Sequence, residues 1–131
     1  MTKIGLSAWK FFSNPARPQI AASEWLIIAS LKNCSPRCSR ANGCSEDKLF
    51  DQIRNNLKTI YKSKPNFFLL FSTGCNIETV LDYFAEKNLV ELNEKNKKIY
   101  WKITDDGETY INKKAPFAEK VFGDKIVGLL K

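Results

Sequence analysis

The fold is decided by residues 74–103, which read GCNIETVLDYFAEKNLVELNEKNKKIYWKI. After a Gly-centred turn, Asn76 is a helix-capping residue, and apolar side chains then recur at helical spacing up to Leu89. Beyond Asn88 the spacing changes to that of strands, because Lys98, Tyr100 and Lys102 alternate with apolar side chains at Ile99, Trp101 and Ile103. This stretch predicts a tight turn, a helix over 76–88, and a two-stranded hairpin with a polar tip at 93–97.

Three further helices are expected before this stretch. A helix from Pro18 to about Asn33 is apolar on most sides and should be deeply buried, whereas residues 1–17 precede it as an irregular arm ending in Asn-Pro-Ala-Arg-Pro. Ser45 caps a long amphipathic helix that ends near Lys64, and Pro65 opens a short helix through Phe71.

After the hairpin, Thr104 is expected to cap a short helix, residues 113–116 to break it, and residues 117–130 to form a last helix. The chain is then one domain over 1–131, with an arm at 1–17, a core at 18–112 that includes a Cys-rich loop at 34–44, and a C-terminal helix within 113–131. We expect Tyr83 and Tyr100 to face outward and the larger aromatic residues to be core: Trp25, Phe67, Phe68, Phe71 and Trp101.

The order of these elements resembles a winged helix-turn-helix domain. Residues 74–80, followed by Leu81, Phe84 and 88–90, are similar to the turn and recognition helix of MarR-, PadR- and ArsR-type regulators, and residues 103–107 are similar to the exit from their wing. The resemblance covers about residues 65–112. It implies an α+β, mostly helical fold with a β-hairpin wing and extra terminal helices, and it implies a sequence-specific DNA-binding transcription regulator.

In that family the helix after the turn enters the major groove of double-stranded DNA and the wing contacts the flanking backbone. The resemblance therefore places helix 76–88 in the groove, with base contacts from Asn76, Glu78, Thr79, Asp82 and Tyr83. It also places the wing, 91–102, on the phosphates through Lys95, Lys97, Lys98 and Lys102. We expect a homodimer formed by the N-terminal arm and helix together with the C-terminal helix, which would bind two half-sites.

The charge distribution qualifies this interpretation. The chain has a formal net charge of +7; residues 1–64 carry 11 Lys and Arg against 4 Asp and Glu, whereas residues 65–131 carry 10 of each. Arg54, Lys58 and Lys62 form a row on one helix, joined by Lys64, and Arg37 and Arg40 lie in the Cys-rich loop. The row is either a solvated face or a phosphate-binding surface. If it binds phosphates, its reversal should weaken DNA binding more than reversal of the wing lysines.

The presumed recognition helix is acidic instead, with Glu78, Asp82 and Glu86 and no Lys or Arg between residues 76 and 86. Carboxylates near phosphates oppose binding unless one accepts a hydrogen bond from cytosine. Two alternatives therefore stay open: a winged-helix protein-interaction module of a replication, transcription or chromatin assembly, and a non-specific nucleic-acid binder that uses the basic N-terminal half.

The four cysteines allow three states. Cys34, Cys38 and Cys44 lie within eleven residues, and Cys75 is remote in the turn. The cysteines are unpaired thiols, or two of the three loop cysteines form a disulfide, or all four bind a metal, for which the spacing is a weak match.

Several functions are disfavoured by composition. The chain has no His, no paired carboxylates and no Gly-Lys phosphate loop, so we expect neither an enzyme nor a cofactor. No apolar run approaches the roughly 20 residues that span a bilayer, and the N-terminus does not resemble a signal peptide, so we expect a cytoplasmic protein without a membrane partner.

Overall fold

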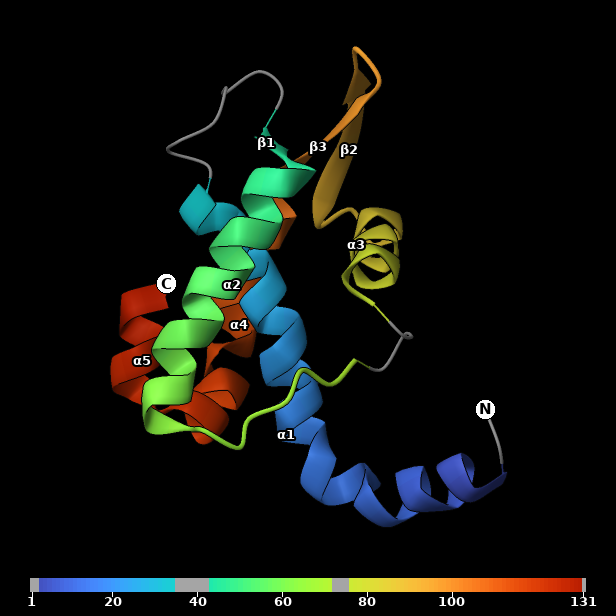
Figure 1. The fold of residues 1–131 in the computed structure, drawn as a ribbon, viewed down its shortest axis with the longest axis vertical. Coiled ribbons are helices and arrows are strands. Elements are labelled where there is room, and N and C mark those ends of the chain that lie inside the picture. Colours follow the sequence, from blue (N-terminus) through green and yellow to red (C-terminus); the bar gives the residue numbers. More distant parts are fainter. Residues whose placement is uncertain (1–2, 35–42, 72–75, 131) are drawn as a thin grey trace.

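The computed structural model describes residues 3–34, 43–71 and 76–130, with side chains described from Gln19 onward. These residues form an α+β, mostly helical fold, as predicted (Figure 1). Its helices are α1 (Lys3–Cys34), α2 (Glu46–Ser63), α3 (Ile77–Glu86), α4 (Asp105–Phe122) and α5 (Asp124–Leu130). Its strands are β1 (Cys44–Ser45), β2 (Val90–Lys95) and β3 (Lys98–Ile103), which pair as one antiparallel sheet in the order β1-β3-β2. No helix among these residues is both long and apolar enough to cross a membrane.

The centre of the fold is the C-terminal half of α1. Every residue from Ala22 to Leu31 is buried, which confirms the prediction for this helix, and α1 packs against α2 and α4. The indole Nε1 of Trp25 donates a 2.8 Å hydrogen bond to the backbone carbonyl of Ile111 in α4. Full burial of each large apolar side chain contributes roughly 1.5–3 kcal/mol, so the fold depends chiefly on this helix.

The N-terminal arm was predicted to be irregular, and this prediction is wrong. The helix begins at Lys3 and continues through Pro15 and Pro18. The fixed φ of proline is itself helical, so a proline within a helix removes one backbone hydrogen bond and bends the axis without stopping it. In Figure 1, α1 changes direction in its N-terminal half, and that part extends away from the other elements.

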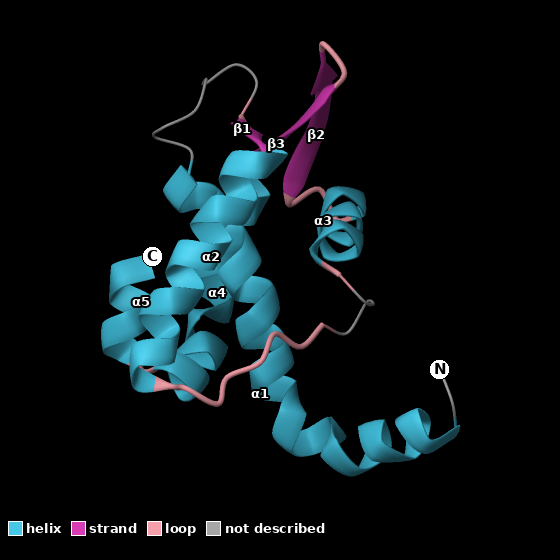
Figure 2. Ribbon diagram, in the orientation of Figure 1, coloured by secondary structure: helices cyan, strands magenta, loops and turns pink. Residues whose placement is uncertain are grey.

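The short helix expected over 65–71 is also absent. A turn at 65–66 follows α2, and residues 67–71 have no regular secondary structure (Figure 2). Their backbone groups have partners on α1, because the Leu70 N–H donates to Ser23 Oγ at 2.9 Å and the Gln19 side chain donates to the Phe68 carbonyl at 3.1 Å. These long-range bonds replace the bonds of a helical turn, so no helix occurs between Ser63 and Ile77 in the residues described there.

The predicted hairpin is confirmed, and it is longer than expected. In the register of β2 and β3, Val90 lies opposite Ile103 and Lys95 opposite Lys98, and the turn contains only Asn96 and Lys97. Both turn residues have positive φ, 54° and 63°, as a tight type I′ turn requires. Trp101 and Ile103 share one face of β3, as the alternation predicted.

Strand β1 was not predicted, because it has only two residues. It pairs with β3, with Cys44 opposite Trp101 and Ser45 opposite Tyr100. Gly43 precedes it with φ of +86°, and any Cβ at this position would overlap the backbone carbonyl of Trp101. Ser45 also caps α2 as predicted, since its side chain accepts a hydrogen bond from the Lys48 N–H.

The C-terminal helices differ from the prediction at their boundary. The predicted break at 113–116 is wrong, because α4 runs continuously to Phe122 with Pro116 inside it. Because Pro116 has no backbone N–H, the carbonyl of Asn112 lacks its partner in the helix. Both residues are exposed, so water can bind that carbonyl. The break occurs instead at Gly123, which has φ of +87° and ends α4. The predicted cap is confirmed, since Thr104 Oγ1 accepts from the Gly107 N–H.

The aromatic predictions hold in part. Trp25, Trp101 and Phe67 are buried, and the ring of Phe67 packs edge-on against Phe122 at 4.9 Å between centroids. Phe71 is half-buried, whereas Phe68 is 67% exposed and is not a core residue. Phe68 points outward because the segment that carries it is extended along α1 and not helical.

Candidate nucleic-acid interface

The N-terminus of α3 is formed by the cap that the sequence predicted. Asn76 Oδ1 accepts hydrogen bonds from the Thr79 N–H at 2.8 Å and from Thr79 Oγ1 at 2.9 Å. Asn76 is exposed and Thr79 half-buried. Both side chains therefore serve the helix itself, and the amide Nδ2 of Asn76 is the group that this cap leaves to donate to a ligand.

The outer surface of α3 is a row of carboxylates. Glu78, Asp82 and Glu86 follow one another at four-residue spacing, and all three are exposed. No basic residue occurs within Ile77–Glu86. Lys87, just beyond the helix, is directed to Tyr83 instead, with its Nζ 5.4 Å from the ring centroid. The most exposed face of α3 is therefore negatively charged.

Tyr83 does not share the outward orientation expected for a base contact. It is half-buried, packs against the core, and lies 6.0 Å from Phe84 between ring centroids. The five predicted base-contact residues thus divide into three groups: a cap made by Asn76 and Thr79, an acidic row that includes Glu78 and Asp82, and Tyr83 at the edge of a cleft.

The wing carries a concentration of positive charge at its tip. Lys95 and Lys98 occupy directly opposite positions on β2 and β3, and Lys97 lies in the turn between them. All three are exposed. Like charges on opposite positions of a β-hairpin are destabilising. A bound anion would therefore reduce the repulsion between these lysines. Lys102 differs, because it is half-buried and lies opposite Glu91 near the base of the hairpin.

The wing base is connected to the helices on both sides. The hydroxyl of Thr104 donates to the Asn88 carbonyl at 2.7 Å and accepts from the Gly107 N–H at 3.0 Å. The indole Nε1 of Trp101 donates to Glu46 Oε2, at the start of α2, at 3.2 Å. These bonds hold the hairpin in one orientation relative to α2, α3 and α4, so that its tip projects from the body (Figure 1).

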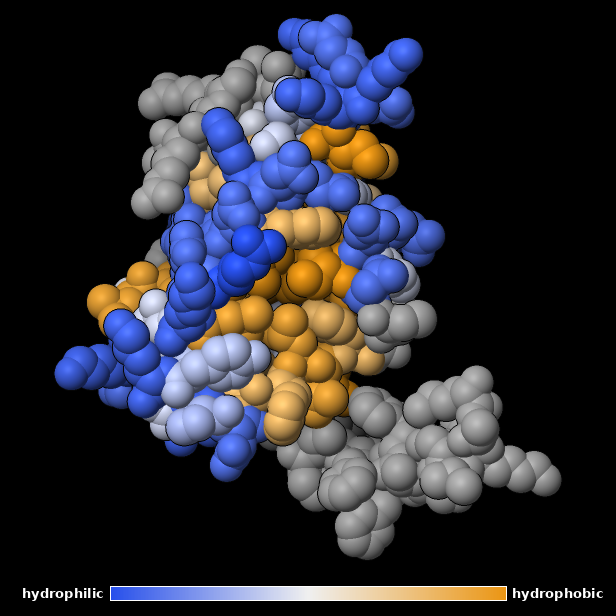
Figure 3. Space-filling model, in the orientation of Figure 1, coloured by the Kyte–Doolittle hydropathy of each residue, from blue (hydrophilic) through white to orange (hydrophobic). Residues whose placement is uncertain are grey.

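The predicted basic row on α2 is present and exposed. Arg54, Lys58, Lys62 and Lys64 all face solvent, and a hydrophilic strip is visible along α2 (Figure 3). Arg54 forms an ion pair with Asp51 at 3.0 Å, on an open surface where both side chains are about two-thirds exposed. The positive charge of Arg54 is therefore partly compensated by Asp51 on the same helix. Arg37 and Arg40 lie outside the described residues.

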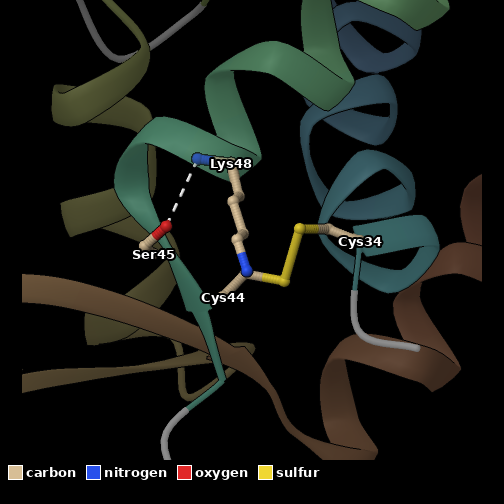
Figure 4. Close-up of a disulfide and its surroundings, with 4 residues drawn as sticks. All are labelled: Cys34, Cys44, Ser45 and Lys48. Atoms are coloured by element: carbon tan, nitrogen blue, oxygen red, sulfur yellow. Dashed lines mark hydrogen bonds between the residues drawn. A yellow bond between two sulfur atoms is a disulfide. The ribbon is translucent and has the colours of Figure 1, made fainter. Parts of the chain in front are cut away.

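Two of the four cysteines are among the described residues. Cys34, at the end of α1, forms a disulfide with Cys44 in β1, and both residues are buried (Figure 4). Of the three states that the sequence allowed, the disulfide is the one that fits the placement of these two residues. The four-cysteine metal site stays a prediction, because two of its cysteines, Cys38 and Cys75, lie outside the described residues.

Sequence reasoning did not identify one feature, a cleft of about 800 Å³ between α1, α3 and α4. Tyr83, Tyr110, Lys87, Lys113 and Lys114 all line it. Its lining residues come from separate segments of the chain, so no single stretch of the sequence indicates the cleft.

Comparisons of the chain with protein-family models, with curated proteins and with solved structures gave no match.

Proposed function

We propose that this protein is a winged-helix DNA-binding regulator that contacts duplex DNA through its wing and α3. The observation that carries the proposal is the wing tip, where Lys95, Lys97 and Lys98 are crowded together and exposed on a hairpin held beside α3. Mutual repulsion among these lysines is relieved by a phosphate backbone, which supplies most of the affinity in protein–DNA complexes.

The order of elements supports the same proposal. Helices α1, α2 and α3 precede the hairpin, as the resemblance to winged helix-turn-helix domains implies, and α4 follows it directly. In this arrangement α2 is the helix before the recognition helix, and residues 64–76 connect the two. The proposal assigns phosphate contacts to the wing, and it assigns base contacts in the major groove to exposed groups of α3, such as Asn76 and a carboxylate that accepts from cytosine.

As proposed, the regulator is a homodimer that binds two half-sites separated by about one helical turn. The N-terminal part of α1 extends away from the other elements and is available for such an interface (Figure 1). Selection of bound sequences from a random duplex pool should then return a palindromic site.

The direct test is the affinity for a random-sequence duplex as a function of salt, measured by fluorescence anisotropy. If six or more phosphates are contacted, affinity should fall about 1000-fold or more between about 50 and 200 mM salt. A single strand of the same sequence serves as control, because equal binding of both forms would indicate the non-specific nucleic-acid binder. Absence of duplex binding at the lowest salt would contradict the proposal.

A second candidate function is favoured by the acidic row of α3. Glu78, Asp82 and Glu86 give the exposed face of this helix three negative charges, which suits a basic protein surface better than DNA. Under this alternative the chain is a winged-helix protein-interaction module. Reversal of the three carboxylates to Lys distinguishes the candidates on the random-sequence duplex, where no base contact is favoured, because it should strengthen binding if α3 lies against DNA and leave it unchanged if α3 faces a protein.

A further inference from the structure

The cleft between α1, α3 and α4 has the size and the lining of a small-molecule site. Its volume of about 800 Å³ lies within the range typical of ligand pockets. The aliphatic and phenyl part of its lining comes from α1, from α3 and from the segment between α3 and β2: Ile20, Ala21, Phe84 and Leu89.

One wall of the cleft is aromatic. The ring of Phe84 lies between those of Tyr83 and Tyr110, at centroid distances of 6.0 Å and 5.7 Å. These distances are those of favourable aromatic pairs, and a planar ligand can continue the same stacking. The hydroxyl of Tyr110 is protonated at neutral pH, as any phenol is, and can donate a hydrogen bond; burial, together with the carboxylate of Glu24 and the nearby Tyr83, raises its pKa further from that pH.

The rim of the cleft is positively charged. Lys87, beyond the end of α3, lines it together with Lys113 and Lys114 of α4. Glu24 is the carboxylate among the described lining residues, so the positive charges exceed the negative ones by two. Apolar and aromatic walls beneath an excess of ammonium groups match a ligand that is apolar in its body and negative at one end.

We infer that this cleft binds a small organic anion with a planar, apolar body. The planar part packs against the wall formed by Tyr83, Phe84 and Tyr110, and the anionic group lies among Lys87, Lys113 and Lys114. Inorganic anions alone would leave the aromatic wall unused. The inference is independent of DNA binding, because each step rests on residues of the cleft.

The test compares two probes that have nearly the same shape and differ in charge. 1-Anilinonaphthalene-8-sulfonate carries one negative charge, and N-phenyl-1-naphthylamine is its neutral analogue. Calorimetry and probe fluorescence at pH 7 should show one sulfonate site per chain and binding of the neutral analogue weaker by about tenfold or more, a difference of about 1.4 kcal/mol. Binding should also raise the unfolding temperature, as it does for any ligand of the native state.

Variants locate the site. Lys87→Glu with Lys113→Glu should weaken sulfonate binding by about tenfold or more, whereas Lys48→Glu with Lys125→Glu makes the same change of charge on exposed positions of α2 and α5 and should leave it unchanged. Lys87→Met with Lys113→Met keeps the side-chain length and should also weaken binding, if the first pair fails to fold. Equal affinity for the two probes, equal effects of the cleft and control pairs, or no saturable site would overturn the inference.

Discussion

Asn56 Nδ2 donates a 2.9 Å hydrogen bond to Ser30 Oγ, where α2 packs on α1. Both residues are buried, and the side-chain Oδ1 of Asn56 in turn accepts from the Gln52 side chain at 3.1 Å. This pair is a polar connection between the two helices, and removal of the Asn56 side chain leaves a buried hydroxyl without this donor.

The variant Asn56→Ala should therefore lower the free energy of unfolding by about 1–3 kcal/mol, the cost of an unsatisfied buried polar group. Chemical denaturation at neutral pH measures the change. Asn55→Ala is the matched control, because Asn55 is exposed on the same helix and its substitution should change stability by less than about 0.5 kcal/mol. Similar losses in both variants would contradict the role of the buried pair.

Loss of the Cys34–Cys44 disulfide should lower the free energy of unfolding by about 3 kcal/mol, because the bond closes a loop of eleven residues in the unfolded chain. The measurement compares denaturation of the oxidised protein with and without a reducing agent. The double variant Cys34→Ala, Cys44→Ala is the control, since its stability should not respond to reduction. If the native protein is equally insensitive, the bond is not present in solution.

Two glycines should respond in opposite directions to the same substitution. Gly43→Ala places a Cβ against the Trp101 carbonyl at a positive φ and should destabilise the protein by more than about 1 kcal/mol. Gly128→Ala lies in α5 with open space around the new Cβ, so it should stabilise the protein by up to about 1 kcal/mol. Thermal unfolding of the two variants provides the comparison, and a shared sign would contradict the conformation of Gly43.

Stability should fall at alkaline pH because of Tyr110. Its folded-state pKa is raised above the ordinary value of 10.0, so the unfolded chain loses its proton first as pH rises. The stabilising contribution of the neutral phenol is complete below pH 10 and is lost above it, at no more than about 1.4 kcal/mol per pH unit. Urea denaturation between pH 9 and 11 should give a smaller loss in Tyr110→Phe than in the native protein. The exposed Tyr61→Phe should leave the loss unchanged.

The relative importance of the wing and α2 is open to a direct measurement. The location of the net charge in residues 1–64 predicted that reversal of Arg54, Lys58 and Lys62 would weaken DNA binding more. Since Asp51 already pairs with Arg54, whereas Lys95, Lys97 and Lys98 are crowded together, we now expect the wing reversal to weaken it more. Neutralising the wing lysines should reduce the slope of log affinity against log salt by about one per residue. A larger effect of the α2 reversal would support the original prediction.

The parts of the fold predicted correctly are those whose signals are local. The caps at Ser45, Asn76 and Thr104, the helical spacing in α2, and the alternation in β3 each depend on a few neighbouring residues. The predictions are wrong where contacts between residues far apart in the sequence determine the local structure. Residues 67–71 are extended because Ser23 and Gln19 bind their backbone, and β1 exists because Gly43 allows it to approach β3.

In the candidate interface, too, the features with local sequence signals were predicted and those that depend on distant contacts were not. The row on α2 was predicted from spacing and the lysines of the wing tip from the resemblance to winged helix-turn-helix domains, and both sets are exposed. The orientation of Tyr83 and the cleft beside it depend on how α1, α3 and α4 pack together, and no local pattern contains that information.

The burial of residues 22–31 of α1 has a consequence for how the chain is synthesised. Trp25 and its apolar neighbours leave the ribosome before Ile111, which accepts the indole hydrogen bond and lies 86 residues later in the chain. Until α4 is made, this helix has an uncovered apolar surface, and nascent chains in that condition are prone to aggregation. The slowest step in producing the native protein should therefore be the late docking of its C-terminal helices, not the formation of its first helix.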